Sequence, residues 1–310
     1  MADAPGGPLY SIVIPTFDRP EALRGCLETI ERLRWRGRPP EVIVVDDGSD
    51  PPCRDVAGAF ASRLRISYDH RPNRGVAVAR NRGLALASGD FVGFVADDHR
   101  LPPDYLSSID GFFRSHPDAQ VISFNLSSSG RSRLRAVQAL YLRLALGQSF
   151  RIGDSRSEAI ASTTLPASRA AMFRRGVFDL VGPFDERLRV GEDGEMGRRL
   201  AEHGFPVYIF PRRFVDHHED RSALDYLRQR LRYGRSFARV LGGGAARGPL
   251  QRLSWLGIPL CAQRKLREWW PVATDQRLRG RFLLFAPLLF GFLVAFYLGC
   301  WLQLRDEAKR

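Results

Sequence analysis

The chain has 310 residues, enough for one large domain or two smaller ones, and its 44% hydrophobic and 26% charged residues are ordinary for a globular protein. Its net charge of +13 is concentrated in residues 221–281, which carry fourteen basic residues against three acidic ones. No zinc, homeodomain or RNA-binding signature accompanies this segment, so we expect no nucleic acid as a partner. The four cysteines lack metal-ligand or disulfide spacing and are expected to be small apolar residues in a reducing compartment.

Residues 9–95 alternate between apolar strands and helices with one apolar face. Strands are expected at residues 9–15, 41–45, 64–68 and 91–95, and helices at 21–33 and 76–87. This strand–helix repeat predicts an α/β fold with a doubly wound, mainly parallel sheet, in which ligands bind at the carboxyl ends of the strands. The first residues lack the basic region and long apolar core of a signal peptide, which predicts that the chain begins in the cytoplasm.

Polar residues follow three of the expected strands. The first strand leads into Pro15-Thr16-Phe17-Asp18-Arg19, the second into Asp46-Asp47-Gly48-Ser49 and the fourth into Asp97-Asp98-His99. Adjacent carboxylates at the end of a buried strand suit a divalent cation that holds a phosphate, although a lone Asp-Asp pair is also typical of a solvated turn. The glycine-rich motifs of dinucleotide and P-loop sites are absent from the sequence.

Glu192 and Asp193 form a second carboxylate pair, directly before a helix expected at residues 194–203. Acids in a first helical turn are favoured by the helix dipole by about 0.3–1 kcal/mol, so a purely structural role is one interpretation. A catalytic base is the other. An apolar run at residues 206–215 then leads into Asp216-His217-His218.

Four motifs, in this order, carry a resemblance to a known family: PTFDRPEAL, EVIVVDDGSD, PNRGVAVARNRGLALASGDFVGFVADD and FDERLRVGEDGEMGRRL. Together they resemble the inverting family-2 glycosyltransferases with a GT-A fold, over about residues 9–235. The resemblance implies a cytoplasmic catalytic domain. It implies transfer of a sugar from a nucleotide-sugar donor to an acceptor hydroxyl, with inversion, assisted by a divalent cation, Mg²⁺ or Mn²⁺.

The resemblance also implies roles for individual residues. Asp98 would hold the metal, with His217 or its neighbour His218 as a further ligand; only one of two adjacent strand residues can face the site, and His217 is the one we favour. Asp193 would take the acceptor's proton, and Glu192 would lie beside it in the catalytic site. The donor nucleotide would be bound by Pro15, Thr16, Arg19, Asp46, Asp47, Asn73, Arg80 and Asp97.

Some of these assignments have alternatives, and the sequence departs from the family pattern at one position. Asp-Gly-Ser after a strand is also a turn sequence, and Arg80 could equally be a solvated helix residue. Ala96 stands where the family's aspartate-rich triplet has its first acid, which leaves Asp98 to carry most of the metal binding. We expect His99, an untypical neighbour, to be a surface residue rather than a ligand.

Residues 282–302 form a run of 21 residues without a charge, close to the roughly 20 that a helix needs to cross a bilayer. We expect a single transmembrane helix that anchors a cytoplasmic catalytic domain to the cell membrane; a buried hairpin or re-entrant helix is the alternative. The basic, tryptophan-containing segment before it is expected to lie against anionic membrane lipid. The expected domains are residues 1–235 (catalytic), 236–281 (interfacial), 282–304 (transmembrane) and 305–310 (a polar tail).

Two functions follow from these features. The first is a membrane-anchored glycosyltransferase that acts on a lipid-linked or cell-surface glycan. The second, motivated by Ala96, is a catalytically weak or inactive nucleotide-sugar-binding homologue that acts as a membrane scaffold. Acceptor selection is expected from residues 125–170.

Overall fold

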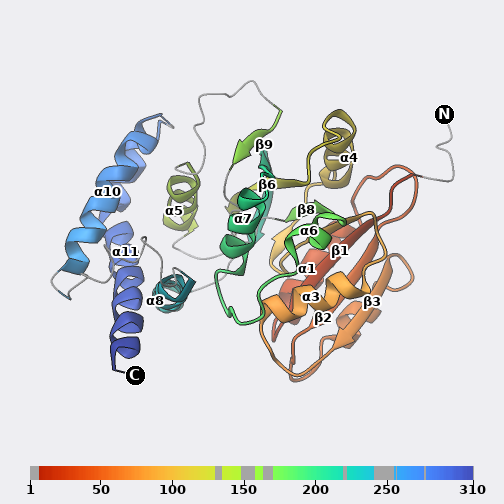
Figure 1. The fold of residues 1–310 in the computed structure, drawn as a ribbon, viewed down its shortest axis with the longest axis horizontal. Helices are drawn as coiled ribbons and strands as arrows, with labels where there is room; N and C mark the ends of the chain where they lie inside the picture. Colours follow the sequence, from red (N-terminus) through yellow and green to blue (C-terminus); the bar gives the residue numbers. More distant parts are fainter. Residues whose placement is uncertain are drawn as a thin grey trace. The chain divides into compact units, whose positions relative to one another are not determined.

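The computed structural model describes residues 7–129, 135–147, 158–162, 170–218, 222–240, 255, 257–275 and 277–309 (Figure 1). The chain divides into two compact units. A sheet-based unit comprises residues 1–129, 155–187 and 192–218, and a helical unit comprises residues 130–154, 188–191 and 219–310. The sheet unit ends at residue 218, and the expected end of the catalytic domain at residue 235 stays a prediction.

The first half of the sheet is parallel. Its strands β1 (Tyr10–Thr16), β2 (Glu41–Asp46), β3 (Arg65–His70) and β4 (Phe91–Phe94) lie in the order β3-β2-β1-β4. Helices α1 (Pro20–Ile30), α2 (Arg54–Gly58) and α3 (Val76–Leu86) connect them. This confirms the predicted strand–helix repeat, and it brings the loops after β1, β2 and β4 to one edge of the sheet.

The second half of the sheet is mixed and was not anticipated in detail. Next to β4 come β8 (Ala171–Arg174), β6 (Val121–Ser129), β9 (Val207–His218) and β5 (His99–Arg100), while β7 (Ile160–Ser162) also pairs with β9. β8 is antiparallel to both β4 and β6, and β6 is parallel to β9. β5 is antiparallel to β9, which places His99 directly opposite His217.

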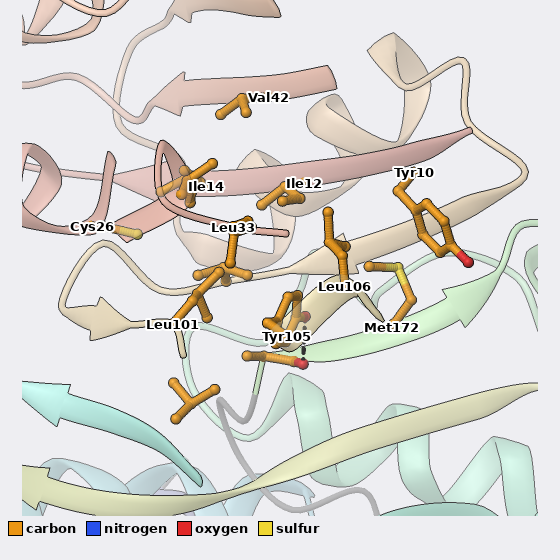
Figure 2. Close-up of a cluster of buried hydrophobic side chains, with 14 of the residues drawn as sticks. Tyr10, Ile12, Ile14, Cys26, Leu33, Val42, Leu101, Tyr105, Leu106 and Met172 are labelled. Carbon is orange, nitrogen blue, oxygen red and sulfur yellow. Dashed lines mark hydrogen bonds between the residues drawn. The ribbon is translucent and has the colours of Figure 1, made fainter. Parts of the chain in front are cut away.

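The sheet is covered on both faces, which explains why its strands read as continuous apolar runs. Ile12 and Val42 face a core formed with α1 and with α4 (Tyr105–Ser115), and Figure 2 shows part of this cluster. Val13 and Ile43 point the other way, into a core formed with α3, α6 (Val177–Val181) and α7 (Glu192–Glu202). Cys26 and Cys53 are buried and not disulfide-bonded, as expected for small apolar residues.

The helical unit contains α5 (Arg135–Gly147), α8 (Ala223–Val240), α10 (Gly257–Asp275) and α11 (Arg279–Ala308). The backbones of α8 and α11 approach very closely. A Cβ at Gly234 would overlap the carbonyl oxygen of Phe296, and a Cβ at Gly299 would overlap that of Leu231. The crossing therefore depends on glycine at both positions, in the way that small residues let helices pack tightly.

Candidate functional site

Asp97 and Asp98 lie in the short connection between β4 and β5, and both are buried. Arg19, in the loop after β1, bridges them: Nη1 donates to Asp97 Oδ1 at 2.9 Å and Nη2 donates to Asp98 Oδ2 at 2.7 Å. Thr16 Oγ1 donates to Asp97 Oδ2 at 2.9 Å. Two buried carboxylates repel one another unless a cation lies between them, so the guanidinium stabilises the pair. The residues predicted to meet from the ends of β1 and β4 do meet.

Two histidines complete this cluster. His217 Nε2 lies 3.2 Å from Asp98 Oδ2, and the rings of His99 and His217 have their centroids 5.5 Å apart. The ligand atoms of Asp98, His99 and His217 all lie within 4.8 Å of one another. His218 instead contacts Asp98 through its backbone amide, which donates to the Asp98 carbonyl at 2.8 Å.

The expectation that His99 is a surface residue was wrong. Its exposed fraction is 0%, because the two-residue strand β5 pairs with β9 and is covered by the fold. Burial lowers the pKa of His99 to about 3, so the imidazole is neutral at physiological pH. No signal in the sequence indicated this, since two residues are too few to show strand periodicity.

Asp98 is held as a carboxylate and His99 as a neutral imidazole, the states in which these two side chains bind a metal ion. Burial by itself would raise the pKa of Asp98, but His217 and Arg19 together lower it well below its ordinary value. Oδ1 of Asp98 and both ring nitrogens of His99 are buried, and none has a hydrogen-bond partner within the described part of the chain. A carboxylate and an imidazole with such unused acceptor positions fit a divalent cation.

Asp46 and Asp47, at the end of β2, have different partners. Asp46 accepts hydrogen bonds from the amides of Ser49 and Cys53, both at 2.9 Å, and from Tyr68 Oη at 2.5 Å. Both oxygens of Asp46 thus hold the loop after β2 in place. These contacts position the loop, and the expected nucleotide contact of Asp46 stays a prediction.

Asp47 ties the end of β2 to the start of α3. Its carboxylate accepts the amide protons of Arg74 at 2.9 Å and Gly75 at 2.8 Å. Gly48 has φ +92°, and a Cβ there would lie 2.7 Å from the amide nitrogen of Asn73. Gly48 therefore provides the turn that the sequence indicated, and it lets the Asn73 loop approach closely.

Arg80, in α3, is bonded to the second pair of acids. Its Nη1 lies 2.8 Å from Glu192 Oε1 and 2.6 Å from Asp193 Oδ1, and all three residues are buried. The guanidinium also lies over the ring of Phe184, 5.2 Å from its centroid. Burial and the charge of Asp193 raise the pKa of Glu192, although Arg80 opposes them. We expected Arg80 to frame the donor phosphates; here it is held by the two expected catalytic acids.

Both clusters lie in the sheet unit, which includes residues 1–129 and 192–218. Pro15 lies in β1, where it pairs with Val45 of β2. Of the region expected to select the acceptor, residues 130–134, 148–157 and 163–169 lie outside the described residues.

Comparisons with known proteins agree with this geometry. The family model "Glycosyl transferase family 2" matches residues 11–181. The chain is 31% identical over 241 residues to the pre-mycofactocin glycosyltransferase of Mycobacterium tuberculosis, covering 76% of this chain and 48% of the relative. It is 30% identical over 236 residues to the validoxylamine A glucosyltransferase of Streptomyces hygroscopicus subsp. limoneus, covering 67% and 52%. The chain thus spans about half the length of these curated relatives.

Solved structures share the fold. The mannosyltransferase PcManGT from Pyrobaculum calidifontis, in complex with GDP-Man and Mn²⁺, aligns with a TM-score of 0.64 at 18% identity, covering 97% of this chain and 88% of that one. S. aureus TarS 1–349, in complex with UDP-GlcNAc, aligns with a TM-score of 0.57 at 15% identity, covering 97% and 91%. These similarities confirm the expected GT-A fold.

Proposed function

We propose that this protein, which belongs to glycosyl transferase family 2, transfers a sugar from a nucleotide-sugar donor to an acceptor hydroxyl with inversion at the anomeric carbon. The observation that carries the proposal is the presence of two separate buried acid clusters, Asp97–Asp98 and Glu192–Asp193, each with its own arginine. An inverting displacement needs charge neutralisation at the leaving diphosphate and a base at the acceptor. Two clusters on different elements can serve these two tasks.

The donor end is assigned to the residues that follow β1, β2 and β4. Asp98 and His217 would hold a divalent cation, which when bound stabilises the negative charge of the departing diphosphate. Asp47 would accept a hydrogen bond from the nucleotide base, since amides of the next loop hold its carboxylate in place. Thr16 and Arg19 keep the Asp97 side chain oriented. The complexes of PcManGT with GDP-Man and of TarS with UDP-GlcNAc support a nucleotide-sugar donor.

The acceptor end is assigned to Asp193. Its carboxylate would take the proton of the acceptor hydroxyl as that oxygen bonds to the anomeric carbon and the bond from this carbon to the diphosphate breaks. Arg80 positions the carboxylate through its 2.6 Å contact. Glu192, whose pKa is raised by burial, shares the same guanidinium and holds it between the two acids.

The test measures nucleoside diphosphate release from a panel of UDP- and GDP-sugars with Mg²⁺ or Mn²⁺, and donor binding by calorimetry. Asp193→Asn is expected to lower turnover by about 10²–10⁴-fold and leave donor affinity unchanged, since a general base contributes that much. Asp98→Ala is expected to lose both. Asp69→Asn, in a solvent-accessible carboxylate at the end of β3, is the matched control and should change neither. Full turnover in Asp193→Asn would refute the assignment of Asp193 as the catalytic base.

The second candidate is a nucleotide-sugar-binding protein without transfer activity, favoured by Ala96 at the first position of the aspartate-rich triplet. The carbonyl oxygen of Ala96 accepts a hydrogen bond from the backbone amide of His99 at 3.0 Å. The turn between these residues is therefore supported by a backbone hydrogen bond and not by an acidic side chain. Donor binding with no product from any sugar in the panel would favour this candidate.

The membrane proposal rests on α11, which by length and composition could cross a bilayer; no other helix in the described residues passes that test. Leu283, Leu284 and Leu288 on this helix are exposed, with accessibilities of 63%, 71% and 43%, and Arg277, Arg279 and Arg281 lie before or at its start. We infer that α11 anchors a cytoplasmic catalytic unit, which would suit a lipid-linked or cell-surface glycan acceptor.

Protection of a C-terminal tag from protease in sealed vesicles tests the anchor. If α11 spans the bilayer, the C-terminal tag and the catalytic unit lie on opposite sides, so protease added outside the vesicles cleaves only one of them. Cleavage of both by the external protease would refute a single pass. Extraction by alkaline carbonate would indicate an interfacial helix instead.

A further inference from the structure

His99 is a buried imidazole that the reaction described above does not use. Its exposed fraction is 0%, and neither ring nitrogen has a hydrogen-bond partner among the residues that the structure describes. Buried polar side chains are almost always hydrogen-bonded, because leaving one unsatisfied destabilises the folded state. An imidazole kept in this position therefore requires an explanation.

The strand pairing aims His99 at the metal cluster. His99 and His217 are direct partners in the antiparallel β5–β9 ladder, and side chains of direct partners lie on the same face. Their ring planes are inclined at 82°, with centroids 5.5 Å apart. The two rings therefore stand next to each other on the side where Asp98 presents its carboxylate.

The spacing of the three side chains suits coordination. Their ligand atoms lie within 4.8 Å of one another. Ligands at about 2.0–2.2 Å from one ion are separated by roughly 3–4.4 Å, so a small side-chain adjustment brings all three to a shared centre. Oδ1 of Asp98 is also buried without a hydrogen-bond partner in the described part of the chain, while Oδ2 is bonded to Arg19. A cation can thus use Oδ1 while Arg19 stays on Oδ2.

We propose that His99 is a direct ligand of the donor-site cation, so that the site consists of two imidazoles and one carboxylate. This inference rests on the proposed function only in taking the site to be the donor site, and it adds which metal the site prefers. Mg²⁺ prefers oxygen ligands and gives up water reluctantly, whereas imidazole suits first-row transition metals. The site therefore selects Mn²⁺ or Co²⁺ over Mg²⁺.

The test is metal binding by the full chain without donor or acceptor. Mn²⁺ is titrated by electron paramagnetic resonance, and coordinated imidazoles are counted from ¹⁴N couplings in the pulsed spectrum of the bound ion. Wild-type protein is expected to show two coordinated imidazoles and to bind Mn²⁺ at least about tenfold more tightly than Mg²⁺.

Two substitutions complete the test. His99→Leu should raise the Kd for Mn²⁺ by at least about tenfold, leave one coupled imidazole and change Mg²⁺ affinity much less. His203→Asn, at the exposed residue that follows the last residue of α7, is the matched control and should change nothing. If His99→Leu does not fold, His99→Gln keeps a polar side chain and should still lose one imidazole coupling.

The proposal is overturned if the wild-type spectrum shows fewer than two imidazoles, or if His99→Leu leaves Mn²⁺ affinity and the ¹⁴N couplings unchanged. Its failure is distinguishable from failure of the proposed function, because no sugar transfer enters the measurement. A protein that binds Mn²⁺ through two imidazoles but transfers no sugar would refute the function and leave this inference standing.

Discussion

Replacing Arg80 by leucine is the sharpest structural perturbation available in the site. The guanidinium bonds to Glu192 at 2.8 Å and to Asp193 at 2.6 Å, and the three side chains are only 7%, 7% and 10% exposed. Arg80→Leu leaves two neighbouring carboxylates buried without that cation. Removing one partner of a buried ion pair costs about 3–5 kcal/mol, so the unfolding equilibrium constant should rise by about two to four powers of ten. The lost contact with the Phe184 ring adds to the cost.

The matched control is Arg82→Leu, two residues further along α3. Arg82 makes a bidentate pair with Asp69, but the two side chains are 34% and 24% exposed. A solvent-screened pair of this kind contributes about 0–1 kcal/mol. Unfolding in urea is followed by hydrogen–deuterium exchange of peptides from α3 and α7, which reports on the sheet unit separately from the helical unit.

The pH dependence of the destabilisation by Arg80→Leu tests whether it has an electrostatic origin. Burial raises the pKa of Glu192 above its ordinary value of 4.5, and removing Arg80 raises it further. A group whose pKa is raised by folding contributes stability below its unfolded pKa and loses it as the pH rises through the folded pKa. The difference between wild type and Arg80→Leu should therefore be larger at about pH 7.5 than at about pH 5. A cost below about 1 kcal/mol, or one that does not change with pH, would refute the reasoning.

Two further perturbations test the fold around the site and in the helical unit. Tyr68→Phe removes the hydroxyl that donates to buried Asp46 at 2.5 Å, and it should cost about 1.5–3 kcal/mol in urea unfolding. Burial by itself would raise the pKa of Asp46, but its hydrogen bonds lower this pKa below the ordinary value. The stability contributed by the ionised carboxylate is therefore lost as the pH falls, and in Tyr68→Phe it should be lost at a higher pH. An unchanged midpoint of acid unfolding would contradict this. Gly234→Ala should cost about 1–3 kcal/mol in detergent, because the added Cβ overlaps the α11 backbone. Gly291→Ala meets nothing within 4 Å and should be neutral or stabilising by up to about 1 kcal/mol; equal effects at both positions would refute the close crossing.

The sequence by itself determined the parallel half of the sheet and the residues at its strand ends. The strands that contain Ile12 and Ile43 are buried on both faces, so their apolar runs are continuous and stand out against the helices between them. The loops after β1, β2 and β4 then had to meet, because parallel strands end on the same edge. Arg19, Asp97 and Asp98 meet there as expected.

Only the tertiary structure decided which distant side chains became partners. Arg80 is separated from Glu192 and Asp193 by 112 and 113 residues, and nothing in the local pattern around an exposed-looking helix arginine indicates such partners. His99 is buried because two residues of β5 pair with the far end of β9. The physical reason is the same in both cases: periodicity reports which face of an element is buried, whereas register between elements far apart in the chain depends on packing of the whole sheet.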